Sequence, residues 1–432
     1  MKSNRRNFIR LAGMSGLTLF GANVLQAFGV DGDGDIKYEE NLFIGSNIQE
    51  ENISIIGEYG QWASSLLERE LPLFSLRRKK WPNLEIWRDA GKERLIERLA
   101  IPDIEGIPKV SVKKQYSYDG LHIEELSWQL PYGHPTEAIL LKPLDAKEPL
   151  PGILAFHDHG MDKFHGKSKI TQINDLRNPM ITAHQKEYYS NRAWANEIAK
   201  RGYVVLVSDA FGFSSRRVML ENVTSEIREI LPGLKSKNSS SLEYIKNYNQ
   251  WAAQHEHILA KSLFSAGTTW PGVFFAEDQK ALDILCARED VDAHRIGCGG
   301  LSGGGLRTNF MAALDSRIKC AVPVGFMTTW NDMVMYKSWT HTWMSFVPLL
   351  PRELDFPEIV GLRTPLPTLV LNNTDDPLFT ISEMRKADEI LKEIYKIADG
   401  DEHYECSFHP GPHKFDSTMQ AEAFDWFDRW LK

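Results

Sequence analysis

The serine-centred stretch Gly299 to Arg307 reads GGLSGGGLR and contains the residue types of a catalytic bend. Its centre, GLSGG, matches the G-x-S-x-G pattern of a nucleophile elbow, although a flexible linker would have the same composition. Residues 295–298 are typical of a strand, and residues 306–314 have helical spacing. Ser302 is therefore predicted at a sharp strand-to-helix turn. That turn would expose its hydroxyl and aim the Gly303 N–H at a developing oxyanion.

A serine hydroxyl is inert at neutral pH unless a histidine accepts its proton and an acid orients that histidine. In the elbow fold the acid and then the histidine follow the serine along the chain. Asp375 and Asp376 lie a few residues past the end of a predicted strand over 367–371, and we prefer Asp376, with its neighbour as a turn former. His413 lies in a Pro-Gly-Pro loop before the last helix and is the predicted base, with His409 as its rival.

The second oxyanion donor is expected from the loop that follows residues 152–156, and we favour the backbone N–H of His159. His157 and His159 form one His-x-His pair, and His255 and His257 form another. Neither pair has a carboxylate or cysteine partner at convincing metal-ligand spacing. The glycine run also lacks the Gly-Lys-Ser/Thr ending of a phosphate loop, so no metal and no other cofactor is expected.

Four further side chains are candidates for contact with a substrate. Trp270, His341 and Trp343 flank the loops expected around the serine and would line a sugar-sized pocket, unless they only pack the cap onto the sheet. Arg307 stands one turn into the helix after the serine. It would either meet an acidic substrate or anchor a neighbouring acid.

The elements that must position these residues alternate between apolar strands and helices. Strands buried on both faces and separated by helices indicate a mostly parallel sheet flanked by helices, which is the α/β class. Right-handed crossovers then bring the carboxyl ends of the parallel strands to one edge, where such folds build their sites. The expected strands are 109–116, 121–128, 137–142, 152–156, 203–207, 295–298, 318–324 and 367–371, and the expected helices include 188–201, 274–286 and 306–314.

The composition of the rest of the chain indicates an N-terminal arm, an α/β domain and a segment inserted in that domain. Residues 28–108 are predicted to form a helical N-terminal arm, and residues 109–432 the α/β domain. The segment 217–270 is too long for a simple connection and is expected to form a cap over the sheet edge. The four cysteines have no paired or metal-like spacing and are interpreted as buried thiols: Cys286, Cys298, Cys320 and Cys406.

The first 27 residues are predicted to be a twin-arginine export signal. Arg5 and Arg6 precede an apolar run that is too short and too rich in glycine for a membrane span. Export would place the protein in the bacterial periplasm or outside the cell, without stable membrane insertion after removal of the signal. The formal net charge is −8, and these residues carry four basic side chains and no acid, which leaves −12 for the remainder. Such an acidic body argues against nucleic acid as a partner.

Several segments in the right order resemble the dienelactone-hydrolase type of α/β-hydrolase, in its exported, acetyl xylan esterase-like branch. The resemblance covers residues 110–432 and implies an α/β-hydrolase fold, a triad of Ser302, Asp376 and His413, and hydrolysis of carboxylic esters. Dienelactone hydrolases use a cysteine nucleophile, so the serine is a departure that points to an esterase. The matching segments are His157–Gly160, Arg201–Val205, Asp209–Gly212, Thr269–Gly272, Arg295–Arg307, Trp343–Met344, Asp376–Thr380 and Pro412–His413.

The expected function is thus that of a serine esterase that removes ester groups, acetyl foremost, from carbohydrate or from small esters. Three alternatives remain open: a methyl esterase of uronic-acid polysaccharides, a peptidase on the same fold, and a non-catalytic carbohydrate-binding relative. A complete triad argues against the last, because a binding protein has no use for all three residues.

Overall fold

The structure, a computed structural model, describes residues 53–68, 71–229 and 241–432 of the 432-residue chain. The predicted export signal over 1–27 and the first part of the predicted arm lie outside the described residues. No helix within the described ranges has both the length and the apolar character needed to cross a membrane.

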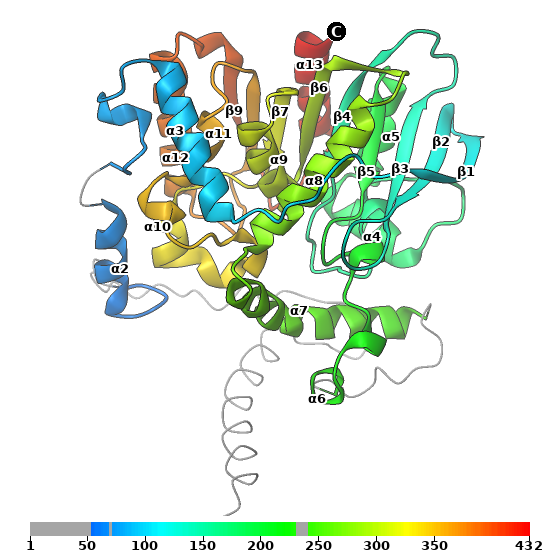
Figure 1. The fold of residues 1–432 in the computed structure, drawn as a ribbon, viewed down its shortest axis with the longest axis horizontal. Helices are drawn as coiled ribbons and strands as arrows, with labels where there is room; N and C mark the ends of the chain where they lie inside the picture. Colours follow the sequence, from blue (N-terminus) through cyan, green and yellow to red (C-terminus); the bar gives the residue numbers. More distant parts are fainter. Residues whose placement is uncertain (1–52, 69–70, 230–240) are drawn as a thin grey trace, which may run out of the picture. The chain divides into compact units, whose positions relative to one another are not determined.

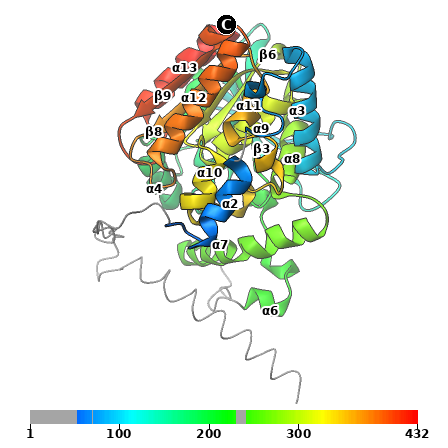
Figure 2. The same cartoon turned by 90° about the vertical axis from the view of Figure 1, so that its left-hand side faces the viewer.

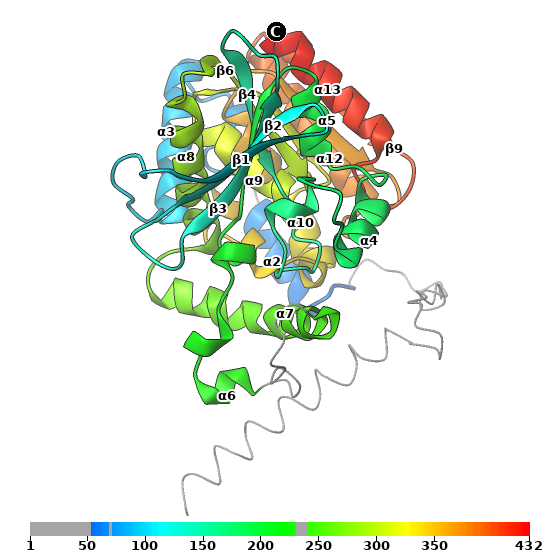
Figure 3. The same ribbon diagram turned by 90° about the vertical axis from the view of Figure 1, so that its right-hand side faces the viewer.

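The described residues form a nine-stranded sheet in the order β1-β2-β3-β5-β4-β6-β7-β8-β9. Strands β1, β2, β3 and β5 pair antiparallel in that order, and all pairs from β5 through β4 to β9 are parallel. Figure 3 shows the antiparallel end of this sheet. The strands are β1 (Ser111–Tyr118), β2 (Leu121–Trp128), β3 (Thr136–Pro143), β4 (Leu150–Phe156), β5 (Val204–Ser208), β6 (Val291–Leu301), β7 (Ile318–Val324), β8 (Thr368–Asn373) and β9 (Tyr404–His409).

The central strands are apolar on both faces because helices cover both faces (Figure 1). Two hydrophobic clusters divide the side chains of these strands between the two layers of helices. One layer contains α3 (Leu84–Leu99), α8 (Trp270–Cys286), α9 (Gly303–Leu314), α11 (Phe356–Gly361) and α12 (Ile381–Ile397); the other contains α5 (Trp194–Lys200) and α13 (Ser417–Leu431).

Strand register determines which loops meet at the carboxyl edge. Phe156 at the end of β4 pairs with Gly300, so the loop after β4 lies beside the predicted elbow. Asn373 at the end of β8 pairs with His409 at the end of β9, so the loops of the predicted acid and base are also neighbours.

One predicted helix is shorter than expected. Of the expected range 188–201, only α5 is helical apart from Tyr188, which ends the separate helix α4 (Pro179–Tyr188). Ser190 and Asn191, between these two helices, have φ angles of 55° and 61°. Consecutive residues in the left-handed region cannot continue a right-handed helix, so the chain reverses there.

The predicted arm is not a separate part from residue 53 onward. Helix α2 (Tyr59–Glu68) precedes α3, and the compact unit extends from Ile53 to Lys432. Trp87, Leu95 and Leu99 of α3 are fully buried in the same hydrophobic cluster as the central strands. The apolar face of α3 therefore belongs to the main core.

The segment predicted as a cap contains α6 (Ser225–Arg228) and the long α7 (Leu242–Ser265). Helix α7 lies across one edge of the sheet rather than on either face (Figures 1 and 2). The cysteines are all free; Cys298 and Cys320 are buried, and Cys286 and Cys406 are half-buried.

Candidate active site

Ser302 stands at a strained bend between β6 and α9. Its φ and ψ angles are 58° and −117°, in a region that a residue with a Cβ atom rarely occupies and that costs on the order of 1–3 kcal/mol. The Ser302 N–H donates to the Val324 carbonyl at 2.8 Å, which ties the bend to β7. A Cβ atom at Gly300 or Gly304 would lie 2.3 or 2.5 Å from the Phe156 carbonyl oxygen. The flanking glycines are thus required by the close approach of β4.

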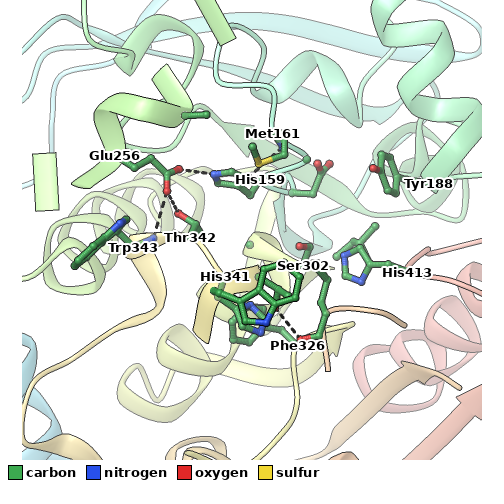
Figure 4. A pocket seen from close by; sticks show the side chains of 18 residues that line it. His159, Met161, Tyr188, Glu256, Ser302, Phe326, His341, Thr342, Trp343 and His413 are labelled. Carbon is green, nitrogen blue, oxygen red and sulfur yellow. Dashed lines mark hydrogen bonds and ion pairs between the residues drawn. The ribbon is translucent and has the colours of Figure 1, made fainter. Parts of the chain in front are cut away.

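His413 and Asp376 form a short hydrogen bond next to this bend. The His413 Nδ1–H donates to Asp376 Oδ2 at 2.6 Å, and Asp376 is only 4% exposed. The other carboxylate oxygen of Asp376 accepts the Leu378 N–H at 2.9 Å. Since Nδ1 carries the proton, Nε2 of His413 has the lone pair; it is buried and has no hydrogen-bond partner among the described residues. Ser302 and His413 line the same pocket (Figure 4).

The two residues that competed with this pair have other partners. Asp375 is exposed, and its carboxylate accepts the Gly411 N–H at 2.7 Å, so it fixes the loop that carries the histidine. His409 bonds through Nε2 to Glu422 of α13 at 2.8 Å. Neither of them lines the pocket that contains Ser302.

The backbone amides of Gly303 and His159 meet beside the serine. A Cβ atom built on Gly303 would stand 3.0 Å from the His159 nitrogen. Gly303 is the first residue of α9, so its N–H is one of the donors that a helix leaves free at its amino end. Among the described residues, neither N–H donates to a backbone or side-chain acceptor. The two donors predicted from the sequence are therefore neighbours in space.

The ring of His159 points away from the serine and into a polar network with the cap helix. Its Nε2–H donates to Glu256 Oε1 at 2.6 Å, and its Nδ1 accepts the Met161 N–H at 3.2 Å. Burial lowers the pKa of His159 below its ordinary value, although Glu256 opposes this shift. His159 thus offers its backbone to the pocket and uses its ring as an anchor.

Glu256 of α7 joins three segments that are distant in sequence. Its carboxylate contacts Lys163 Nζ at 2.7 Å. It also accepts the Thr342 hydroxyl at 2.7 Å and the Trp343 N–H at 3.3 Å (Figure 4). Burial alone would raise the pKa of Glu256, but Lys163 and His159 outweigh burial and hold that pKa far below its usual value. The sequence analysis did not single out Glu256. The pattern that could have indicated it is a charged residue on the buried face of α7, four residues from both Ala252 and Ala260.

The pocket above Ser302 has a volume of about 380 Å³. His341 and Trp343 line it, as the sequence predicts, together with the unpredicted Trp339, which is 71% exposed at the rim. Burial lowers the pKa of His341 to about 4, so its ring is neutral at pH 7. Met161 and Tyr188 also line the pocket.

Two predicted substrate contacts do not reach this pocket. Trp270 is 1% exposed at the start of α8, where its ring packs under Lys163 Nζ at 4.7 Å. Arg307 is also 1% exposed; its guanidinium donates to Asp278 at 2.8 Å and stacks on Phe156 at 4.4 Å. The prediction that Trp270 contacts substrate is corrected, because its ring is packed inside the protein. Of the two predictions for Arg307, the structure shows the anchoring of a neighbouring acid, since a buried guanidinium needs a carboxylate partner and finds it on α8.

The His-x-His pairs have structural partners. His157 bonds to the backbone at both ring nitrogens, and His255 stacks on Trp251 with ring centroids 4.5 Å apart. In the described part of the chain, no group of three or more His, Cys, Asp or Glu side chains is arranged to hold a metal ion.

A known protein resembles this chain in sequence. The chain is 25% identical over 295 residues to the putative hydrolase YtaP of Bacillus subtilis (strain 168), which covers 68% of this chain and 83% of that protein. No protein-family model matches the chain.

Solved structures give the same result at lower identity. A putative acetyl xylan esterase from Bacteroides fragilis NCTC 9343 superposes with a TM-score of 0.61 and 15% identity, over 89% of this chain and 85% of that one. A glucuronoyl esterase from Solibacter usitatus superposes with a TM-score of 0.55 and 12% identity, over 83% of this chain and 97% of that one. These superpositions confirm the predicted α/β-hydrolase fold: the chain has the same fold as these esterases.

Proposed function

We propose that the protein is a serine hydrolase that cleaves carboxylic esters of carbohydrate. The observation that carries the proposal is the short His413–Asp376 hydrogen bond, together with a strained Ser302 that lines the same pocket as His413. This arrangement supplies a nucleophile, a base and the acid that orients the base. A flexible glycine-rich linker would not hold its serine at these strained φ and ψ angles.

In the proposed mechanism, Ser302 Oγ attacks the ester carbonyl while His413 Nε2 accepts its proton. The N–H groups of Gly303 and His159 donate to the oxyanion of the tetrahedral intermediate. His413 then protonates the leaving alcohol, and an acyl-enzyme remains on Ser302. Water, deprotonated by His413, hydrolyses the acyl-enzyme and regenerates the serine. Asp376 keeps the proton of the imidazole on Nδ1 throughout.

The pocket supports an acetylated sugar as the substrate. Its volume of about 380 Å³ is larger than an acetyl group requires, and Trp339 and Trp343 offer aromatic faces to a sugar ring. No lysine or arginine among the described residues lines the pocket, so it offers no cationic partner to the free uronate carboxylates of a partly methyl-esterified polysaccharide. The names of the similar structures, which include a methylesterase, also point to carbohydrate esters.

The test is covalent labelling by a fluorophosphonate. We expect one site of modification, mapped by mass spectrometry to the peptide that contains Ser302. Ser302→Ala and His413→Ala should each abolish both the labelling and the turnover of p-nitrophenyl acetate. Ser265→Ala, which changes an exposed serine at the end of α7, is the control and should behave like the wild type. Labelling that persists in Ser302→Ala would refute the assignment.

A panel of substrates then tests the substrate class. Acetylated xylan, methyl-esterified pectin and aminoacyl p-nitroanilides represent the acetyl, methyl and peptidase alternatives. We expect the highest kcat/KM on the acetylated polysaccharide; a preference for either other class would replace the proposed substrate while leaving the nucleophile in place.

A further inference from the structure

A lysine buried behind the oxyanion loop has no role in the mechanism described so far. Lys169 ends the short 3-10 turn Lys167–Lys169 and is completely buried. Its Nζ donates to the carbonyl oxygens of Asp158 at 3.0 Å and His159 at 2.8 Å. A buried ammonium group has a high desolvation penalty, so its placement against two backbone carbonyls of this loop calls for an explanation.

The first of those carbonyls belongs to the peptide that supplies the oxyanion donor. In a trans peptide, the C=O of Asp158 and the N–H of His159 point in opposite directions from one rigid plane. The same carbonyl also accepts the Nδ1–H of His157 at 2.9 Å. With its oxygen held by two donors, the plane is restrained against rotation, and the His159 nitrogen lies beside Gly303.

The charge on Lys169 has a second consequence. A hydrogen bond from a cation to a carbonyl withdraws electron density from the amide, and the N–H at the other end becomes a stronger donor. The positive charge is balanced on its far side by the Asp158 carboxylate, which lies 3.7 Å from Nζ. That carboxylate is itself bonded to His184 at 3.0 Å and to the Tyr189 hydroxyl at 2.5 Å.

We propose that Lys169 is a positioning residue for ester hydrolysis: it orients and polarises the Asp158–His159 peptide so that its N–H is ready for the oxyanion before substrate binds. The inference rests on the proposed function. It adds that the strength of the oxyanion hole depends on a cation that never contacts the substrate.

Kinetics of charge-changing variants give the first test. Lys169→Gln keeps a donor near the Asp158 carbonyl but removes the charge, and Lys169→Arg keeps the charge. We expect Lys169→Gln to lower kcat for p-nitrophenyl acetate about 10- to 100-fold with little change in KM, because loss of a whole oxyanion donor costs about 10²–10³. Lys169→Arg should recover part of the loss. Lys142→Met, which removes a lysine paired with Asp290 at the opposite edge of the sheet, is the control. An unchanged kcat in folded Lys169→Gln would overturn the inference.

A paired variant covers the case in which loss of Lys169 prevents folding. Asp158→Asn removes the buried negative charge, and Asp158→Asn with Lys169→Met removes both charges, so no buried charge is left unpaired in the double variant. The inference predicts that the double variant has a lower kcat than Asp158→Asn alone. Equal kcat values in these two proteins would contradict it.

A spectroscopic test observes the peptide itself. Asp158-His159 is the only Asp-His dipeptide in the sequence, so carbonyl-¹³C aspartate combined with ¹⁵N-histidine yields one selective amide signal. A trifluoromethyl ketone that adds to Ser302 forms a stable oxyanion mimic. We expect the His159 amide proton to move downfield in the wild type and to move less in Lys169→Gln.

The outcomes separate the two claims. If no adduct forms at Ser302, both the proposed function and the inference fail. If the adduct forms and the His159 amide does not move, the nucleophile stands but the inference fails, because this peptide is not the donor. Equal movement in the wild type and in Lys169→Gln would leave the oxyanion hole intact and refute the role of Lys169.

Discussion

The two sides of the pocket are built in different ways. The side that we propose to supply the nucleophile, here called the nucleophile side, consists of Ser302, Asp376 and His413, each on a short loop at the carboxyl end of a strand. The side that we propose to bind the oxyanion, here called the oxyanion side, consists of the loop from His157 to Lys169 together with Glu256 of α7. Backbone strain and strand register place the first group, whereas buried charged side chains from distant segments hold the second.

The difference shows where each side is vulnerable. On the nucleophile side, a substitution removes a group that we propose to be catalytic but leaves the backbone hydrogen bonds to the sheet in place. On the oxyanion side, a substitution leaves a charge or a polar atom unpaired in a buried place, so it lowers stability in addition to any effect on activity. The contrast would be sharper if variants on the nucleophile side changed only activity and variants on the oxyanion side also lowered stability.

The largest effect is expected for the acid of the nucleophile side. Asp376→Asn should lower kcat on the order of 10⁴-fold, because an amide cannot keep the His413 proton on Nδ1, while thermal stability changes little. Steady-state kinetics on p-nitrophenyl acetate measure the loss. Asp375→Asn is the matched control, since an amide oxygen can still accept the Gly411 N–H. A larger loss of kcat in Asp375→Asn would reverse the assignment of the two neighbours.

Next in size is the loss of Glu256 on the oxyanion side. Glu256→Gln should lower the free energy of unfolding by about 3 kcal/mol, since Lys163 would remain buried and charged without its partner. Urea unfolding monitored by tryptophan fluorescence gives the value. Glu256→Gln combined with Lys163→Met should be more stable than Glu256→Gln alone. If the single variant kept wild-type stability, the cap would not depend on this ion pair, and the contrast between the two sides would fail.

The third prediction concerns pH. Burial, together with Arg307 and Lys169, lowers the pKa of His157 to about 3. The ordinary pKa of histidine is about 6.5, so between these values only the unfolded chain binds the proton, and stability falls as pH falls from about 6.5 toward 3. At pH 5 this contributes a loss of about 2 kcal/mol relative to pH 7. His157→Gln should therefore show a weaker dependence of unfolding free energy on pH than the wild type.

Exposed His294 provides the control for this measurement. His294→Gln should keep the wild-type slope of unfolding free energy against pH. If the free energy of unfolding falls equally with pH in His157→Gln and in the wild type, the prediction is contradicted. The burial of a neutral His157 would then not be the cause of the acid sensitivity.

The smallest effect is expected at the rim of the pocket, which depends neither on backbone strain nor on buried charges. Trp339→Ala should raise KM for an acetylated xylo-oligosaccharide about fivefold and leave p-nitrophenyl acetate unchanged, because an aromatic contact with a sugar is worth about 1 kcal/mol. Trp62→Ala on α2, a similarly exposed tryptophan outside the pocket, is the control. An equal rise in KM for both esters would show that Trp339 shapes the pocket rather than binding the sugar.

The sequence by itself determined the parts of this protein that depend on local constraints. Apolar runs buried on both faces predict the parallel strands, and β7 has the predicted bounds, Ile318–Val324. The glycines around Ser302 predict a bend because a Cβ atom at Gly300 or Gly304 would meet the β4 backbone. The order of serine, acid and base places each residue after a strand, and the structure brings all three loops to one edge.

Only the tertiary structure decided which side chains from distant segments of the chain reach that edge of the sheet. Glu256 contacts His159 across 97 positions of sequence, and no local pattern indicates which loop an acid on α7 will reach. Trp270 and Arg307 lie within conspicuous motifs, yet packing turns them inward, away from the pocket. Backbone conformation is governed by neighbouring residues and can be predicted from them. The partner of a buried charge depends on how helices and loops dock, because the charge must be paired wherever the folded chain excludes water.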